Sequence, residues 1–159
     1  MAYCDVDVSL FDQVGDTLRS LLPSDLGACH MRSHRRGIKV WFGPETGNKD
    51  HYESQIIARR HVDEQEGLAL ETGFHAEHKL TKRNDQTLAI LMAAEREWRE
   101  TLGPEASGGP FYGRPADWRR LSDVWFEPDL DDPELAFELA ARLADYITVI
   151  EPLLADRTD

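Results

Sequence analysis

The sequence predicts an α+β domain in which a mostly antiparallel sheet of about five strands carries helices on one face. Apolar residues recur at helical spacing in some segments and alternate with polar residues in others. These segments follow the order α-β-β-β-β-α-β-α along the chain. The 159 residues suit a single domain, residues 1–159, that is long enough to bury a core.

The first helix is expected to begin at Ser9 and to end near Leu22, because Pro23 stops it. Its apolar stripe consists of Leu10, Val14, Leu18, Leu21 and Leu22. Two short strands, 28–32 and 38–42, should follow, joined by a turn that ends in Gly37.

Two long strands are expected at 51–62 and 68–79, with the polar segment 63–67 between them. In the second strand Leu68, Leu70, Thr72, Phe74 and Ala76 alternate with Ala69, Glu71, Gly73, His75, Glu77 and Lys79. This period of two predicts a sheet with one face on the core and the other available to solvent or ligand.

The second half of the chain predicts a helix from Asn84 to about Leu102, a Gly- and Pro-rich loop at 103–115 and a strand at 121–126. The last helix should end near Ile150, before Pro152. Its stripe is the clearest in the chain: Leu135, Leu139, Leu143, Tyr146, Ile147 and Ile150.

The charge of the chain is negative and uneven. The net charge is −12, and segment 123–159 holds eleven acidic residues against two arginines, whereas segment 30–42 holds four basic residues and no acidic one. Such a balance disfavours nucleic acid as a partner. The apolar runs are too short to span a bilayer, and the N-terminus does not resemble a signal peptide. The chain has only two cysteines, Cys4 and Cys29. These features indicate a cytoplasmic protein without a membrane partner.

The long hairpin contains the arrangement that most resembles a chemical site. If Val62 opposes Leu68, then Glu53 opposes Glu77 on the polar face of the sheet. Directly opposed carboxylates repel each other and require compensation. A divalent cation, a shared proton, or the side chains of His51, His75 and Lys79 would supply it.

One alternative is therefore a metal-dependent nuclease or phosphodiesterase. Glu77-His78-Lys79 at the end of one strand, with Asp50 or Glu53 on the preceding strand, resembles the PD-(D/E)xK nuclease superfamily in motif and in element order over residues 9–127. The resemblance implies that Glu53, Glu77 and Asp50 would hold Mg²⁺ or Mn²⁺ and that Glu53, Glu77 and Lys79 would form the catalytic set.

A second alternative draws on the histidines of the same face. His51, Glu53, His75 and Glu77 together offer ligands for zinc or another transition metal.

The leading hypothesis from the sequence is a non-enzymatic protein-interaction module that needs no cofactor. The order of its elements resembles small acidic chaperone-like or immunity-type proteins. An acidic surface suits a basic protein partner, and an edge strand suits a homodimer. The expected binding residues are His75 on the open sheet face, the basic side chains Arg35, Arg36 and Lys39, and Trp41, which is expected to be exposed.

Overall fold

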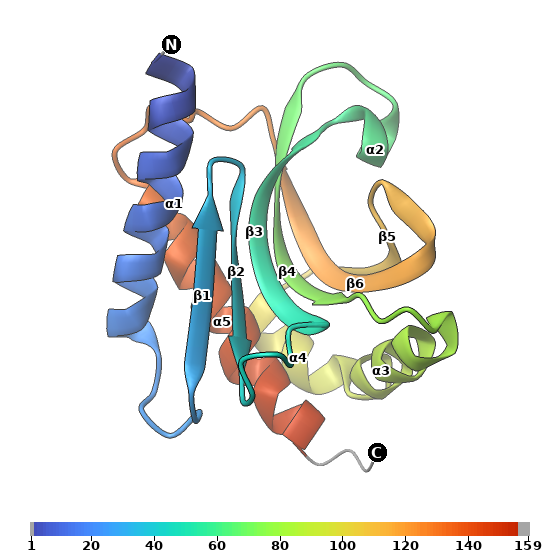
Figure 1. The fold of residues 1–159 in the computed structure, drawn as a ribbon. Helices are drawn as coiled ribbons and strands as arrows, with labels where there is room; N and C mark the ends of the chain where they lie inside the picture. Colours follow the sequence, from blue (N-terminus) through green and yellow to red (C-terminus); the bar gives the residue numbers. More distant parts are fainter. Residues whose placement is uncertain (1, 156–159) are drawn as a thin grey trace.

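A computed structural model describes the backbone of residues 2–155 and the side chains of residues 10–155. It contains a six-stranded sheet in the order β1-β2-β3-β4-β6-β5, in which every neighbouring pair is antiparallel (Figure 1). The elements are α1 (Ala2–Leu21), β1 (Cys29–His34), β2 (Gly37–Phe42), β3 (Asp50–Ala58), α2 (Arg60–Asp63), β4 (Leu68–Ala76), α3 (Thr81–Ala93), α4 (Glu95–Leu102), β5 (Ser107–Phe111), β6 (Arg114–Phe126) and α5 (Leu135–Ala155). The predicted α+β class and antiparallel sheet are confirmed, with six strands instead of five.

The additional strand, β5, lies within the segment that was predicted to be a loop. Glycine and proline made it look irregular, but β5 is an edge strand and pairs on one side only, with β6. Gly108 packs closely against α3: a Cβ atom at this position would lie 2.6 Å from the sulfur of Met92, whose flexible side chain would have to move. β6 is also longer than expected, since it begins at Arg114.

The helix between the two halves of the sheet is divided. α3 ends at Ala93 and α4 begins at Glu95, and the indole of Trp98 donates a 2.7 Å hydrogen bond to the carbonyl of Leu91 at the break. Asn84, at which this helix was expected to begin, lies inside α3, and its buried amide binds the backbone of His78 and Asp117. The last helix, α5, is also longer than expected: it does not end near Ile150 but continues past Pro152 to Ala155.

The hydrophobic core lies between the sheet and the helices α1, α3, α4 and α5 (Figure 1). Every residue of the predicted stripe on the last helix is buried. A polar network centred on Asp123 of β6 crosses this layer, since its carboxylate accepts hydrogen bonds from Tyr146 and Arg142 of α5. None of the described helices is long and apolar enough to cross a membrane.

The hairpin register differs from the prediction. Glu53 lies opposite Gly73, not opposite Glu77, because β3 ends at Ala58 and the short helix α2 occupies the positions that were expected to extend the strand. The shift involves an even number of residues, so each side chain keeps its predicted face. Tyr52, Ile56, Leu70 and Phe74 accordingly lie in the core.

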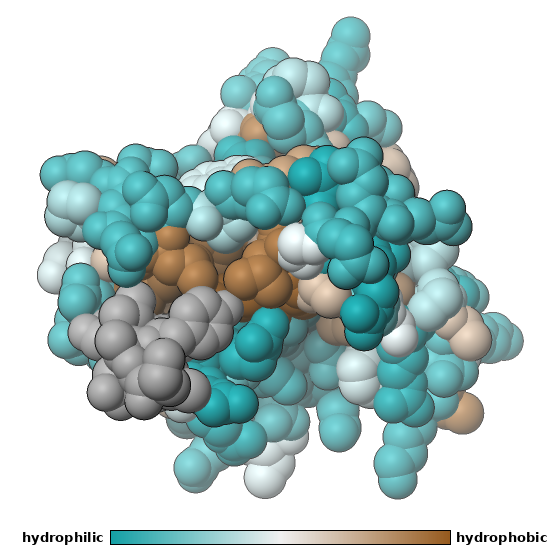
Figure 2. All heavy atoms as spheres, turned by 90° about the horizontal axis from the view of Figure 1, so that it is seen from above, coloured by the Kyte–Doolittle hydropathy of each residue, from teal (hydrophilic) through white to brown (hydrophobic). Residues whose placement is uncertain are grey.

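The second face of the sheet is not open to solvent at its centre, as had been expected. The sheet curls, and the β5–β6 hairpin bends back towards β3 and β4 (Figure 1). His51, Glu53, Glu71 and His75 all point to this face and are buried. Seen from above, at the end of the molecule opposite to the C-terminus, other hydrophobic side chains lie in a hollow whose rim is hydrophilic (Figure 2).

Candidate metal centre

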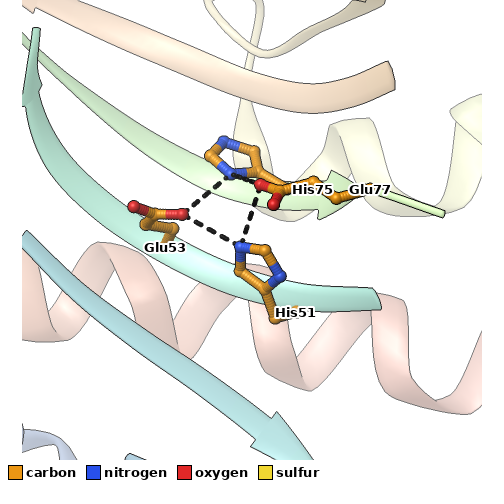
Figure 3. A group of neighbouring side chains, drawn as sticks. All are labelled: His51, Glu53, His75 and Glu77. Atoms are coloured by element: carbon orange, nitrogen blue, oxygen red, sulfur yellow. Dashed lines mark hydrogen bonds and ion pairs between the residues drawn. The ribbon is translucent and has the colours of Figure 1, made fainter. Parts of the chain in front are cut away.

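Two adjacent strands bring two histidines and two glutamates together on the concave face of the sheet. His51 and Glu53 lie two residues apart on β3, and His75 lies directly opposite His51 on β4. Glu77 follows the end of β4, where its backbone N–H donates a hydrogen bond to the carbonyl of Lys49. The four side chains converge on one point between the strands (Figure 3).

The nitrogen and oxygen atoms that face this point are close together. Nε2 of His51 lies 2.9 Å from Oε1 of Glu53 and 3.3 Å from Oε2 of Glu77. Nδ1 of His75 lies 3.2 Å and 3.5 Å from the same two oxygens. One such atom from each of the four residues lies within 4.8 Å of every other.

This geometry suits four-coordinate binding of a metal ion. Zinc binds imidazole nitrogen and carboxylate oxygen at about 2.0–2.2 Å, so the ligand atoms of a regular tetrahedron are about 3.4 Å apart. The four measured nitrogen–oxygen distances, 2.9–3.5 Å, lie around that value. The other pairs of ligand atoms lie within 4.8 Å of each other, so side-chain movements of about 1 Å would bring all four residues onto one ion.

The outer nitrogen of each histidine is already held by a hydrogen-bond acceptor. Nδ1 of His51 lies 3.0 Å from the carbonyl of Asn48, and Nε2 of His75 lies 3.1 Å from Oε2 of Glu71. Carbonyls and carboxylates only accept, so these outer nitrogens carry hydrogen. A neutral ring then directs its lone pair at the central point, as metal-binding histidines do.

Glu71 is itself fixed from two sides. Gln55 donates a 2.9 Å hydrogen bond to one of its oxygens, and the hydroxyl of Ser122 on β6 donates a 2.7 Å bond to the other. The carboxylate is fully buried. This chain of contacts orients the ring of His75, which is the role of outer-shell partners in metal sites.

Without a cation, the cluster must hold protons. Burial lowers the pKa of His75, but the charge of Glu71 and the hydrogen bonds to Glu53, Glu71 and Glu77 raise it well above its ordinary value. In His51 burial also opposes the bonds to Glu53 and Glu77, and the net pKa is raised. Burial raises the pKa of Glu53, whereas bonds from both histidines lower it to about 2.

The concave face is covered where the cluster lies. The ring of Phe111 on β5 packs edge-on against His75, with 4.6 Å between the ring centres. Gly73, between Glu71 and His75, allows β4 and β6 to approach closely, because a Cβ atom there would lie 2.3 Å from the carbonyl oxygen of Leu121. Glu77 is the least buried of the four residues, with a side-chain exposure of 10%.

Two residues of the nuclease set lie elsewhere. Lys79 is exposed beyond the end of β4, and no described contact joins it to the cluster. The lysine beside the cluster is Lys39 of β2, whose Nζ lies 3.9 Å from Oε1 of Glu77. Asp50 points to the opposite face, where it lies 3.1 Å from Nε2 of His78, because it is one residue out of phase with His51.

The residues expected to bind a partner are also separated. Trp41 is only 3% exposed, so the expectation of an exposed indole is wrong. Its ring stacks on His30 of the neighbouring strand, and its N–H donates to the carbonyl of Glu45. Arg35 lies exposed in the β1–β2 turn, whereas Arg36 lines a cavity with Gln55 and Phe111. His75 lies within the cluster and is not exposed.

Three partners of the cluster were not identified from the sequence. The predicted register, with Val62 opposite Leu68, places Arg59 opposite Glu71, but in the structure Arg59 binds Asp63 and Glu127. The alternation of residues on β4 does place Glu71 on the same face as His75, four residues away, and was the available signal. Nothing in the sequence pattern identified the carbonyl of Asn48 or the hydroxyl of Ser122, because both depend on the tertiary fold.

No protein-family model matches the chain, and the searches of curated proteins and of solved structures gave no significant match. The cluster must therefore be interpreted from its own chemistry.

Proposed function

We propose that the protein binds one divalent transition-metal ion through His51, Glu53, His75 and Glu77. The observation that carries the proposal is the arrangement of the histidines. Each ring has its outer nitrogen on an acceptor and its inner nitrogen 2.9–3.5 Å from two carboxylate oxygens. An inner nitrogen without a proton would face only acceptors, and a cation removes that conflict.

The donor set also indicates the kind of metal. Two imidazole nitrogens with two carboxylate oxygens suit Zn²⁺, Fe²⁺ or Mn²⁺. Mg²⁺ prefers an octahedral shell of oxygens and would gain little from the histidines. Of the two ions expected for the nuclease alternative, Mn²⁺ thus fits this donor set better.

Metal-assisted phosphodiester hydrolysis is a second candidate. It is favoured by the approach of Glu53 and Glu77 to one point and by Lys39, which lies 3.9 Å from Glu77 in place of the expected Lys79. In such a reaction the ion would polarise the phosphoryl group or activate water, and Lys39 would stabilise negative charge.

The protein-interaction module also stays a proposal. The net charge of −12 supports a basic protein partner, and β1 and β5, the two terminal strands of the sheet, would support a homodimer. The cytoplasmic location belongs to the same proposal. Metal binding and partner binding are compatible, since the cluster is buried and leaves the outer surface free.

Isothermal titration calorimetry of the metal-free protein with Zn²⁺, Mn²⁺ and Mg²⁺ tests the metal centre. We expect one site per chain, tightest for Zn²⁺ and weakest for Mg²⁺. Glu77→Ala should reduce zinc affinity by about 100-fold or more, and this variant should fold because Glu77 is the least buried ligand. The control Glu97→Ala removes an exposed carboxylate of α4. Absence of binding, or equal affinity in the two variants, would refute the proposal.

A further inference from the structure

A cavity of about 490 Å³ lies on the same concave face as the cluster, between β3, α2 and the β5–β6 hairpin. This volume is typical of pockets for small molecules. Its walls include the aromatic side chains of Phe111, Tyr112 and Trp118, all partly accessible. Phe111 and Trp118 pack edge to face, with their ring planes at 90° and their ring centres 5.2 Å apart, so the two rings form an aromatic corner in the wall of the pocket.

The ionisable side chains that line the cavity include three basic residues and no carboxylate. Arg36, His61 and Arg114 contribute to its lining, and no acidic residue does. A fourth basic group lies behind the wall, because the guanidinium of Arg120 lies 3.8 Å from the centre of the Tyr112 ring. In a chain with a net charge of −12, an acid-free pocket of this kind is a local reversal of charge.

Arg36 is the lining residue best placed to meet an anionic ligand. The residue is half-buried, and none of the described side chains forms an ion pair with it. Arg114 is more exposed and is shared between Asp117, at 3.4 Å, and the face of Trp118, at 4.4 Å. A carboxylate or phosphate in the cavity would gain a charge-assisted bond to Arg36 without displacing an internal partner.

We infer that this cavity binds a small organic anion with a flat, aromatic body. The anionic group lies at Arg36 and Arg114, and the flat body lies in the corner between the perpendicular rings of Phe111 and Trp118. The inference goes beyond the metal centre and does not depend on it. The two sites nevertheless share a wall, because Phe111 also packs on His75 and Gln55 also binds Glu71.

The test uses benzoate as the probe and its uncharged analogue benzamide as the matched ligand, titrated by calorimetry at neutral pH with a chelator present. We expect one benzoate per chain and an affinity for benzamide that is about tenfold weaker. Arg36→Gln should weaken benzoate binding by about tenfold. The control Arg96→Gln, which removes an exposed arginine of α4, should leave it unchanged. The benzoate affinity of Arg114→Gln, a variant of the second arginine that lines the cavity, provides a second measurement of the anion site.

Three results would overturn the inference: no saturable benzoate binding, equal affinity for benzoate and benzamide, or equal effects of Arg36→Gln and Arg96→Gln. Repeating the titration with the Glu77→Ala variant separates this site from the metal centre. If the Glu77→Ala variant still binds benzoate, the anion pocket exists independently of the metal centre. If the Arg36→Gln variant still binds zinc, the metal centre exists independently of the anion pocket. The failure of either proposal is thus visible without the other.

Discussion

Nε2 of His75 lies 3.1 Å from Oε2 of Glu71, and both side chains are fully buried on the concave face of the sheet. This contact fixes the tautomer of His75, because the carboxylate can only accept a hydrogen bond. The opposite nitrogen of the ring is thereby directed at Glu53 and Glu77. Glu71 is therefore a positioning residue for the proposed metal site and not a ligand.

Glu71→Gln should lower the affinity for zinc by about 10- to 100-fold while all four ligands remain. The uncharged amide is a weaker acceptor for the ring and can present its NH₂ group to His75. A competition titration against a chromophoric chelator measures the change, and Glu97→Gln on the surface of α4 is the control. An unchanged zinc affinity in a folded Glu71→Gln protein would show that Glu71 serves only the fold.

The metal-free protein should lose stability as the pH rises above about 6.5, the ordinary pKa of histidine. The pKa values of His51 and His75 are raised in the folded state, so their contribution is complete at lower pH and disappears as the pH passes through the folded values. Glu53 and Glu77 have lowered pKa values, so their contribution is lost as the pH falls below about 4.3.

Urea unfolding at a series of pH values, with a chelator present, measures this dependence. The free energy of unfolding should be greatest between about pH 4.3 and 6.5. With excess zinc the trend above that range should reverse, because protons and metal compete for the same nitrogens. A metal-free protein that becomes more stable between about pH 6.5 and 8 would contradict the assigned protonation of the cluster.

Gly73→Ala should destabilise the protein by about 1–3 kcal/mol and weaken zinc binding. A Cβ atom at this position would meet the carbonyl oxygen of Leu121 at 2.3 Å and the Cα atom of Ser122 at 2.5 Å. β4 and β6 would have to separate, which would move Ser122 away from Glu71. Gly109→Ala in the edge strand β5 is the control, because its Cβ atom would make an ordinary 3.7 Å contact with Arg120. If the two variants unfold at the same temperature, the close approach of β4 and β6 at Gly73 does not contribute to stability.

Tyr146→Phe should destabilise the protein by about 1–3 kcal/mol without changing zinc affinity. Its hydroxyl donates to Oδ1 of Asp123 in the core, at 2.5 Å, on the face of the sheet opposite to the cluster. The variant therefore separates loss of stability from loss of the site. Urea unfolding and zinc titration of the same preparation measure both, and a large loss of zinc affinity would mean that the two faces are coupled.

The fold class was predictable because each element has a marked period. The stripe from Leu135 to Ile150 and the alternation from Leu68 to Ala76 required no tertiary information. β5 was missed because Gly108, Gly109 and Pro110 have low strand propensity, and their strand exists through packing against α3 and pairing with β6.

The four residues of the cluster were predictable for the same reason. A shift of the register by an even number of residues leaves every side chain on its predicted face of the sheet. The predicted cross-strand partner of Glu53 was therefore wrong, but His51, Glu53, His75 and Glu77 were still predicted to share one face. Residues outside the alternation were not predictable. Lys79 is displaced because β4 ends at Ala76, and Lys39 replaces it because β2 pairs with β3 through Lys39 and Glu53. The burial of Trp41 depends on His30 and on the loop that carries Glu45.

The most direct measurement of the central claim is X-ray absorption at the zinc edge of protein loaded with one equivalent of zinc. The account predicts a four-coordinate shell of nitrogen and oxygen at about 2.0–2.1 Å, with the multiple-scattering signature of two imidazoles. His75→Ala should reduce that signature to one imidazole. A shell without imidazole, or a six-coordinate shell of oxygen alone, would contradict the assignment of His51, Glu53, His75 and Glu77 as a metal centre.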